Sequence, residues 1–224
     1  MENTASLELL PDDVLKEIYL LEEHAKRLET RERAQEEFMS YVHHVYDNFI
    51  EGTHHRIISE KLERIAKGEL KRLIVNMPPR HSKSEFASYL MPSWFLGRNP
   101  KLKIIQATMN TELAVRFGRK VRDLIADPKY REVFPNTDLK PDSQAAGRWE
   151  TAAGGEYFAA GVGAAMTGRG ADLLIIDDPH SEQDALSTTA YDNAYEWYTS
   201  GPRQRLQPGG SIIIVQTRWS KKDI

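Results

Sequence analysis

The sequence predicts an α/β protein with a mostly parallel central sheet flanked by helices and preceded by a helical arm. Apolar segments of strand length recur along the chain, an amphipathic helical pattern separates two of them, and a charged helical pattern precedes them all. With 224 residues the chain can bury one full α/β core. We therefore expect residues 1–50 to form the arm and residues 51–224 to form one domain.

The arm is predicted from residues 12–40, which are dense in Glu, Lys and Arg. Apolar residues recur there every three or four positions, as on one face of a helix. These positions are Leu15, Ile18, Leu21, Ala25 and Leu28.

Four apolar segments are predicted to be buried strands. They are residues 73–77, 102–107, 173–176 and 212–215. A helix follows the second strand, with Asn110 as its cap and Asp127-Pro128 at its end. Alternating strands and helices are typical of a parallel sheet covered on both faces. Residues 140–171 are rich in glycine, and we expect hairpins and a mobile loop there.

Composition narrows the classes of function. A net charge of −3 argues against a wholly basic nucleic-acid-binding protein, although a local basic stripe stays possible. The absence of cysteine excludes disulfides, thiolate nucleophiles and cysteine zinc sites. No apolar run approaches the ~18 residues that a membrane-spanning helix needs, and the amino terminus lacks the pattern of a signal peptide. A soluble intracellular protein without a membrane partner is expected.

The most informative segment is residues 73–84, in which an apolar run enters a turn that ends in Lys83-Ser84 and opens an apparent helix. Backbone N–H groups at a helix start favour phosphate oxygens. In a P-loop the lysine reaches the β- and γ-phosphates and the Ser/Thr hydroxyl binds Mg²⁺. The match is partial, because Met77 and Ser82 stand at the two glycine positions. A lysine at an ordinary helix start is the alternative.

Two adjacent carboxylates, Asp177 and Asp178, follow the third predicted strand. In open α/β sheets ligands bind at the carboxyl ends of the strands. One carboxylate there can hold Mg²⁺ and its neighbour can orient an attacking water. A simple turn before Pro179 is the alternative. Together with Lys83-Ser84, the acidic pair indicates phosphoryl-transfer chemistry.

A third candidate segment, Thr217-Arg218-Trp219, lies at the end of the last predicted strand. A hydroxyl at this strand end can sense the γ-phosphate, and Arg218 can pass that signal to another surface. In the alternative interpretation, Thr217 only ends the strand and Trp219 only fills the core.

Three motifs, in this order and spacing, resemble the large terminase subunit of tailed bacteriophages. They are residues 77–85 (MPPRHSKSE), 167–179 (TGRGADLLIIDDP) and 217–219 (TRW). The resemblance runs from His54 to the final residue. In that family the amino-terminal half is a P-loop ATPase of the additional-strand, RecA-like class, which pumps double-stranded DNA into a procapsid. A carboxyl-terminal RNase H-like nuclease follows it.

The resemblance implies an Mg²⁺-dependent ATPase motor domain that binds ATP and translocates DNA. The implied partners are double-stranded DNA, the portal protein of the procapsid and the small terminase subunit, with assembly as a homo-oligomeric ring, a pentamer, on the portal. The implied location is the cytoplasm of the infected bacterium, at the portal vertex. Because the sequence ends at Ile224, we expect no nuclease activity and either a truncated or an unusually short form.

The resemblance also implies roles for individual residues. Lys83 is the phosphate lysine, Ser84 and Asp177 are the magnesium-side residues, Asp178 is the catalytic carboxylate, and Thr217 couples hydrolysis to domain motion. The family often has Glu in place of Asp178.

Other residues are expected near the nucleotide. If the base is not Asp178, Glu85 and Asp172 are the weaker candidates. The arginine that neutralises the transition state is Arg80 in cis or Arg169 in trans, and we favour Arg169 because its glycine neighbours suit an exposed flexible loop. The remaining expected nucleotide contacts are Pro79, Arg80, His81, Ser82 and Glu85 in the loop, and His55 and Phe49 at the adenine; core packing is the alternative for the last two.

Two surfaces carry weaker predictions. Arg116, Arg119 and Lys120 share a helix face that could contact DNA phosphates, with a solvated face as the default. Residues 1–50 fit a subunit contact, an adenine lid or a docking site for the small subunit equally well.

Two other functions stay open. One is a nucleotide-gated assembly module that binds ATP with little hydrolysis, which the missing loop glycines favour. The other is a fragment of a superfamily-2 helicase or translocase, which is disfavoured because the chain is too short for a second RecA-like domain.

Overall fold

The computed structural model describes residues 11–224, so residues 1–10 of the expected arm lie outside the described part. The helices are α1 (Asp12–Glu36), α2 (Phe38–Val45), α3 (Thr53–Ala66), α4 (Met91–Arg98), α5 (Thr111–Ala126), α6 (Pro128–Val133) and α7 (Thr188–Ser200). The strands are β1 (Arg72–Asn76), β2 (Lys103–Thr108), β3 (Leu139–Ala145), β4 (Arg148–Thr151), β5 (Glu156–Gly161), β6 (Ala171–Asp177) and β7 (Leu206–Gln216). A π-helical segment, Glu85–Leu90, leads into α4, and short 3₁₀ turns lie at Asp184–Leu186 and Pro202–Arg205.

The strands form a 7-stranded sheet in the order β1-β7-β6-β2-β5-β4-β3. Neighbours from β1 to β5 pair in parallel, whereas β4 and β3 add as antiparallel strands. The predicted mostly parallel sheet is therefore confirmed, and so is a hairpin, β3–β4, in the glycine-rich segment. That segment also contains β5, which pairs with β2 inside the sheet and is not a loop.

Strand β1 departs from the expectation of a buried strand. It pairs with β7 alone at the edge of the sheet, and its side chains alternate between exposed and half-buried. Ile74 is 57% exposed. The other three predicted strands are buried, apart from the half-buried residues 102 and 103, because neighbouring strands flank them and side chains cover both faces.

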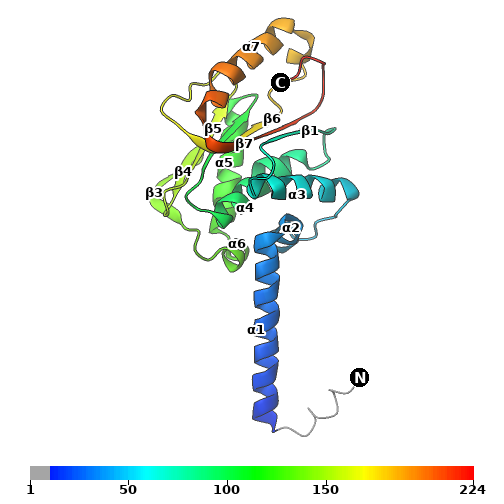
Figure 1. The fold of residues 1–224 in the computed structure, drawn as a ribbon, viewed down its shortest axis with the longest axis vertical. Helices are drawn as coiled ribbons and strands as arrows, with labels where there is room; N and C mark the ends of the chain where they lie inside the picture. The colour runs from blue at the N-terminus through cyan, green and yellow to red at the C-terminus, as the bar shows by residue number, and fades with distance from the viewer. Residues whose placement is uncertain (1–10) are drawn as a thin grey trace.

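Two apolar clusters cover the two faces of the sheet. The larger one holds aromatic side chains from α2, the π-helical segment and α4, among them Phe38, Phe86 and Trp94. The smaller one lies on the other face, where Trp197 of α7 packs against it. Figure 1 shows α7 and α1 at opposite ends of the molecule.

Helix α5 begins and ends as the sequence predicts. The side chain of Asn110 accepts a hydrogen bond of 2.9 Å from the backbone N–H of Leu113, and Asp127 caps the following helix α6. Gly118 lets α5 approach the β3–β4 hairpin closely, because a Cβ there would lie 2.4 Å from the carbonyl oxygen of Ala146. The helix is thereby fixed beside the sheet.

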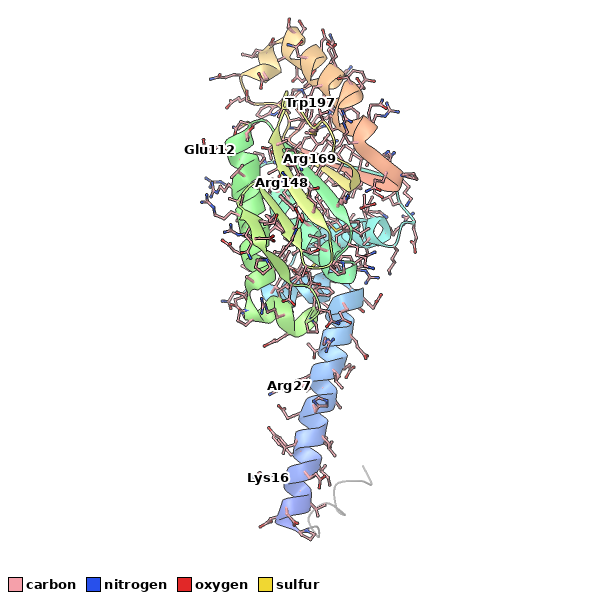
Figure 2. The ribbon with its side chains drawn as sticks, turned by 90° about the vertical axis from the view of Figure 1, so that its left-hand side faces the viewer. Lys16, Arg27, Glu112, Arg148, Arg169 and Trp197 are labelled. Atoms are coloured by element: carbon pink, nitrogen blue, oxygen red, sulfur yellow. The ribbon has the colours of Figure 1, made fainter. Side chains whose placement is uncertain are left out.

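The part of the arm that stands free is α1, which projects from the body as a single helix (Figures 1 and 2). Among the residues of α1, Ala34 alone is buried. The predicted apolar positions from Leu15 to Leu28 therefore do not pack on the body. Helix α2, by contrast, buries Phe38, Tyr41 and Val42 in the main core. The free arm therefore ends near residue 33, and residues 38–45 belong to the body. Within residues 11–224, none of the helices is both long enough and apolar enough to span a membrane.

Candidate functional site

Three strands bring the predicted site residues to one edge of the sheet. β1, β7 and β6 run in parallel, with Asn76 beside Gln216 and Asp177 beside Val215. The segments that follow these strands therefore start at the same carboxyl edge, where α/β folds bind ligands.

Lys83 connects two of these segments. Its side chain is 7% exposed, and Nζ lies 2.8 Å from Oδ2 of Asp178. Nζ also donates a hydrogen bond of 3.1 Å to Oγ1 of Thr217. A buried ammonium requires such partners, because an unpaired charge in this position would be strongly destabilising.

Asp178 is held on both carboxylate oxygens. Oδ2 faces Lys83, and Oδ1 accepts a hydrogen bond of 2.7 Å from the backbone N–H of Thr217. The backbone of Asp178 has a φ of 42°, in the left-handed region that few side chains adopt. Such strain is often found at functional positions.

Asp177 is the buried acid of the site, with 2% of its surface exposed. Its Oδ1 accepts a hydrogen bond of 2.9 Å from Ser84, and its Oδ2 accepts one of 2.6 Å from Ser88. Burial, aided by the charge of Asp178, raises the pKa of Asp177 to about 6, although both serine hydrogen bonds favour the charged form. This carboxylate is thus fixed in orientation and poorly solvated.

Ser88 and Gln106 are site residues that the sequence interpretation missed. Both are fully buried, and Nε2 of Gln106 donates a hydrogen bond of 2.9 Å to Oγ of Ser88. Ser88 lies in the π-helical segment, and such segments are frequent at functional sites. Two signals were available: Ser88 lies four residues after Ser84, and Gln106 is a polar residue in an apolar strand.

Two residues of the loop before Lys83 have a left-handed backbone conformation. Arg80 and Ser82 each have a φ of 63°. Ser82 stands where the P-loop sequence pattern has a glycine, and its backbone adopts a conformation that glycine adopts readily. Pro79 and His81 are exposed beside them, and a ring nitrogen of His81 lies 2.9 Å from the carbonyl oxygen of Pro79.

The two alternative bases have other partners. Both carboxylate oxygens of Glu85 accept hydrogen bonds from Lys120, at 2.8 and 3.0 Å. Asp172 accepts a hydrogen bond of 2.7 Å from the backbone of Lys103 at the amino end of β6, about 16 Å along the strand from Asp177. Asp172 is therefore wrong as a candidate base for this site.

The basic face expected on α5 is incomplete, because Lys120 pairs with Glu85. Arg116 and Arg119 are exposed, but Lys120 turns towards Glu85 and lies 4.3 Å from the ring centre of Tyr89. After β7, Trp219 is 44% exposed, so the alternative interpretation, in which it only fills the core, is wrong.

Arg169 lies far from Lys83 of its own chain. It precedes β6 at the amino edge of the sheet, about 20 Å of strand length from Asp177. Its guanidinium pairs with Glu156 and lies 3.8 Å from the ring centre of Phe158, and its side chain is 19% exposed. Arg148 pairs with the same Glu156, and Figure 2 shows the two arginines over one part of the sheet. The expectation of an exposed, flexible arginine is wrong, because Glu156 and Phe158 hold it.

His55 and Phe49 pack with the helix that follows the loop. The ring of His55 stacks on Phe86 with centres 5.0 Å apart, and Phe49 lies 5.5 Å from Phe86. His54 and Phe49 also pack against the ring of His55, which is buried, and burial lowers its pKa. For His55 the structure agrees with the packing alternative and not with a stacked adenine.

The donor atoms at the site fit Mg²⁺ better than a transition metal. Ser84 and Asp177 offer hard oxygen atoms, which Mg²⁺ prefers. Among the described residues no cluster of three or more His, Cys, Asp or Glu side chains could hold a metal ion.

Comparisons with known proteins find a weak similarity to a solved structure. No family model matches the sequence, and no curated protein matches it. Among solved structures, the chain is similar to the crystal structure of the HK97 bacteriophage large terminase, with a TM-score of 0.43 and 13% sequence identity. The match covers 71% of this chain and 32% of that chain, so this chain spans about a third of the terminase. A similarity of this size assigns no function.

Proposed function

We propose that this protein is an Mg²⁺-dependent ATP hydrolase that acts as the motor domain of a phage terminase and translocates double-stranded DNA into a procapsid. One observation carries the proposal: Lys83 lies 2.8 Å from the carboxylate of Asp178 at the carboxyl edge of a parallel sheet, beside the buried Asp177. A lysine in a phosphate loop and two acids at that edge are the parts that phosphoryl transfer needs.

The contacts suggest how the side chains act. Lys83 exchanges Asp178 for phosphate oxygens when ATP binds, which leaves Oδ2 of Asp178 free to orient a water molecule. The backbone N–H of Thr217 keeps Oδ1 of Asp178 in place meanwhile. Ser84 and Asp177 would hold Mg²⁺. A bound Mg²⁺ would neutralise the charge that develops on the phosphates.

Arg80 is the arginine that we assign to the site in cis, because it lies three residues before Lys83 in the same loop. Arg169 would act only in trans, in a ring in which the amino edge of one sheet meets the loop of a neighbour. The proposed ring partners are further copies of the chain, the portal protein and the small terminase subunit, at the portal vertex in the infected cell.

The test is ATP turnover with Mg²⁺, with and without duplex DNA. Lys83→Ala is expected to abolish turnover, since the phosphates lose their cation. Asp178→Asn is expected to retain ATP binding and to lose hydrolysis. Lys140→Ala is the matched control, because Lys140 also pairs with an acid, Glu150, but lies in the β3–β4 hairpin. Normal turnover in Lys83→Ala or Asp178→Asn would contradict the proposal.

A nucleotide-gated assembly module is the second candidate. It is favoured by the closed contacts of Asp178, whose two oxygens are both occupied by Lys83 and Thr217. In such a module ATP would bind and order the chain with little hydrolysis. Turnover that rises on addition of DNA, portal protein and small terminase subunit would reject it, whereas strand separation would favour a helicase.

A further inference from the structure

We propose that α1 is a pairing arm that binds the α1 of a second copy of this chain in an antiparallel coiled coil. The helix projects from the body and buries Ala34 alone of its residues. Among its exposed side chains are Tyr19, Leu20, Leu21 and Leu28. A free helix with this many exposed apolar side chains usually has a partner.

The apolar spacing on α1 is that of a coiled-coil seam. Alternate steps of four and three residues separate its members, which is the a/d pattern of a heptad repeat. The members are Val14, Ile18, Leu21, Ala25 and Leu28. All five are at least partly exposed, so the body leaves the seam open.

The charges of α1 favour the antiparallel orientation. Residues 12–23 carry five acids and one lysine, a net charge of −4, whereas residues 24–33 carry four bases and two acids, a net charge of +2. A parallel pair would place each half beside a half of its own sign. An antiparallel pair places the acidic half of one helix beside the basic half of the other, which is favourable at low salt.

The free length of the arm suits this register. Interlocking the a and d positions of two antiparallel helices places Ile18 opposite Leu28 and Leu21 opposite Ala25. The same register places residue 12 of one copy opposite residue 34 of the other. Position 34 is where α1 becomes buried in the body, so the pair would use the whole free length of each arm.

Disulfide cross-linking distinguishes the orientations, because the chain contains no cysteine. We expect a mixture of the full-length Ile18→Cys and Leu28→Cys variants to form a mixed disulfide under mild oxidation. In a parallel pair these positions lie about 15 Å apart, too far for a disulfide. Self-cross-linking of Leu28→Cys without the mixed product would show a parallel pair and overturn the proposal.

The mass in solution, measured by light scattering after gel filtration, tests the pairing itself. The wild-type chain is expected to be a dimer at low salt and to dissociate as salt rises, since the charges are screened. The double variant Leu21→Glu/Leu28→Glu is expected to be monomeric with an unchanged melting temperature of the body. Tyr19→Glu is the matched control, because Tyr19 is 63% exposed and lies off the seam. A monomeric wild-type chain, or a monomeric Tyr19→Glu variant, would overturn the proposal.

Discussion

The hydroxyl of Ser88 donates a hydrogen bond of 2.6 Å to Oδ2 of Asp177, while Ser84 donates to Oδ1. Both serines belong to the helical stretch that starts at Lys83, directly after the loop that follows β1. The acid at the end of β6 is therefore fixed by the helix that carries the loop. This makes Ser88 a positioning residue for Asp177, because it acts on the orientation of that carboxylate.

We expect Ser88→Ala to lower turnover about tenfold and to destabilise the protein by about 1–3 kcal/mol. The substitution leaves one oxygen of a buried carboxylate without its donor and also removes a partner of Gln106. The carboxylate can then rotate away from the orientation in which we propose that it holds Mg²⁺. Steady-state kinetics and denaturant unfolding measure the two effects.

Ser93→Ala is the matched control for Ser88→Ala. Ser93 is also fully buried, but its hydroxyl bonds to Tyr41 and to the carbonyl oxygen of Leu90, away from the acids. A similar loss of stability with normal turnover is expected. If both serine variants lose turnover equally, Ser88 has only a structural role.

Ser82→Gly should stabilise the protein by up to about 1 kcal/mol and retain turnover. Ser82 has a φ of 63°, which costs a side-chain-bearing residue about 1–2 kcal/mol. Part of the gain is lost, because glycine adds entropy to the unfolded chain. Thermal and denaturant unfolding measure the difference.

Ser82→Ala separates backbone strain from the loss of the hydroxyl. Alanine keeps a Cβ at the same φ, so no stabilisation is expected. Equal stabilisation by Gly and Ala would show that the left-handed backbone of Ser82 is not the cause.

The sequence was sufficient to predict the centre of the site. Lys83, Asp177, Asp178 and Thr217 each follow an apolar segment of strand length, and parallel strands end at a common edge. The fold rule therefore predicts their proximity without tertiary information. Lys83 contacts Asp178 and Thr217, and its neighbour Ser84 bonds to Asp177, so the four residues do lie together.

The sequence was not sufficient to predict features that depend on strand order or on contacts between residues far apart in the chain. Nothing local shows that β1 lies at the sheet edge, because strand order depends on which segments pair. Glycines beside Arg169 suggested mobility, but Glu156 and Phe158 hold its side chain from another strand. Ser88 was overlooked because its acceptor lies 89 residues away in the sequence.

We expect Arg80→Ala to reduce turnover at every protein concentration. Arg169→Ala should reduce turnover only at high concentration, where subunits meet, because Arg169 lies at the opposite edge of the sheet from Asp177. It should also cost about 1 kcal/mol of stability, since Glu156 and Phe158 lose a partner. Turnover measured across protein concentration distinguishes these effects.

Arg148→Ala is the control for Arg169→Ala, because Arg148 pairs with the same Glu156 but is mostly exposed. It should leave turnover unchanged at all concentrations. If Arg169→Ala is equally silent, the proposed role of Arg169 in trans is wrong and Arg80 is the remaining candidate.

Thr217→Val should retain ATP binding and lower turnover about tenfold, which corresponds to about 1.4 kcal/mol. Valine keeps the shape of the side chain and the backbone N–H that holds Asp178, but it removes the oxygen that accepts from Lys83. Thr217→Ser restores that oxygen and should restore turnover. Because the N–H is present in all three proteins, a loss of turnover in Val that Ser restores is assigned to the hydroxyl and not to the backbone. Equal turnover in Thr217→Val and wild type would mean that Thr217 acts only through its backbone.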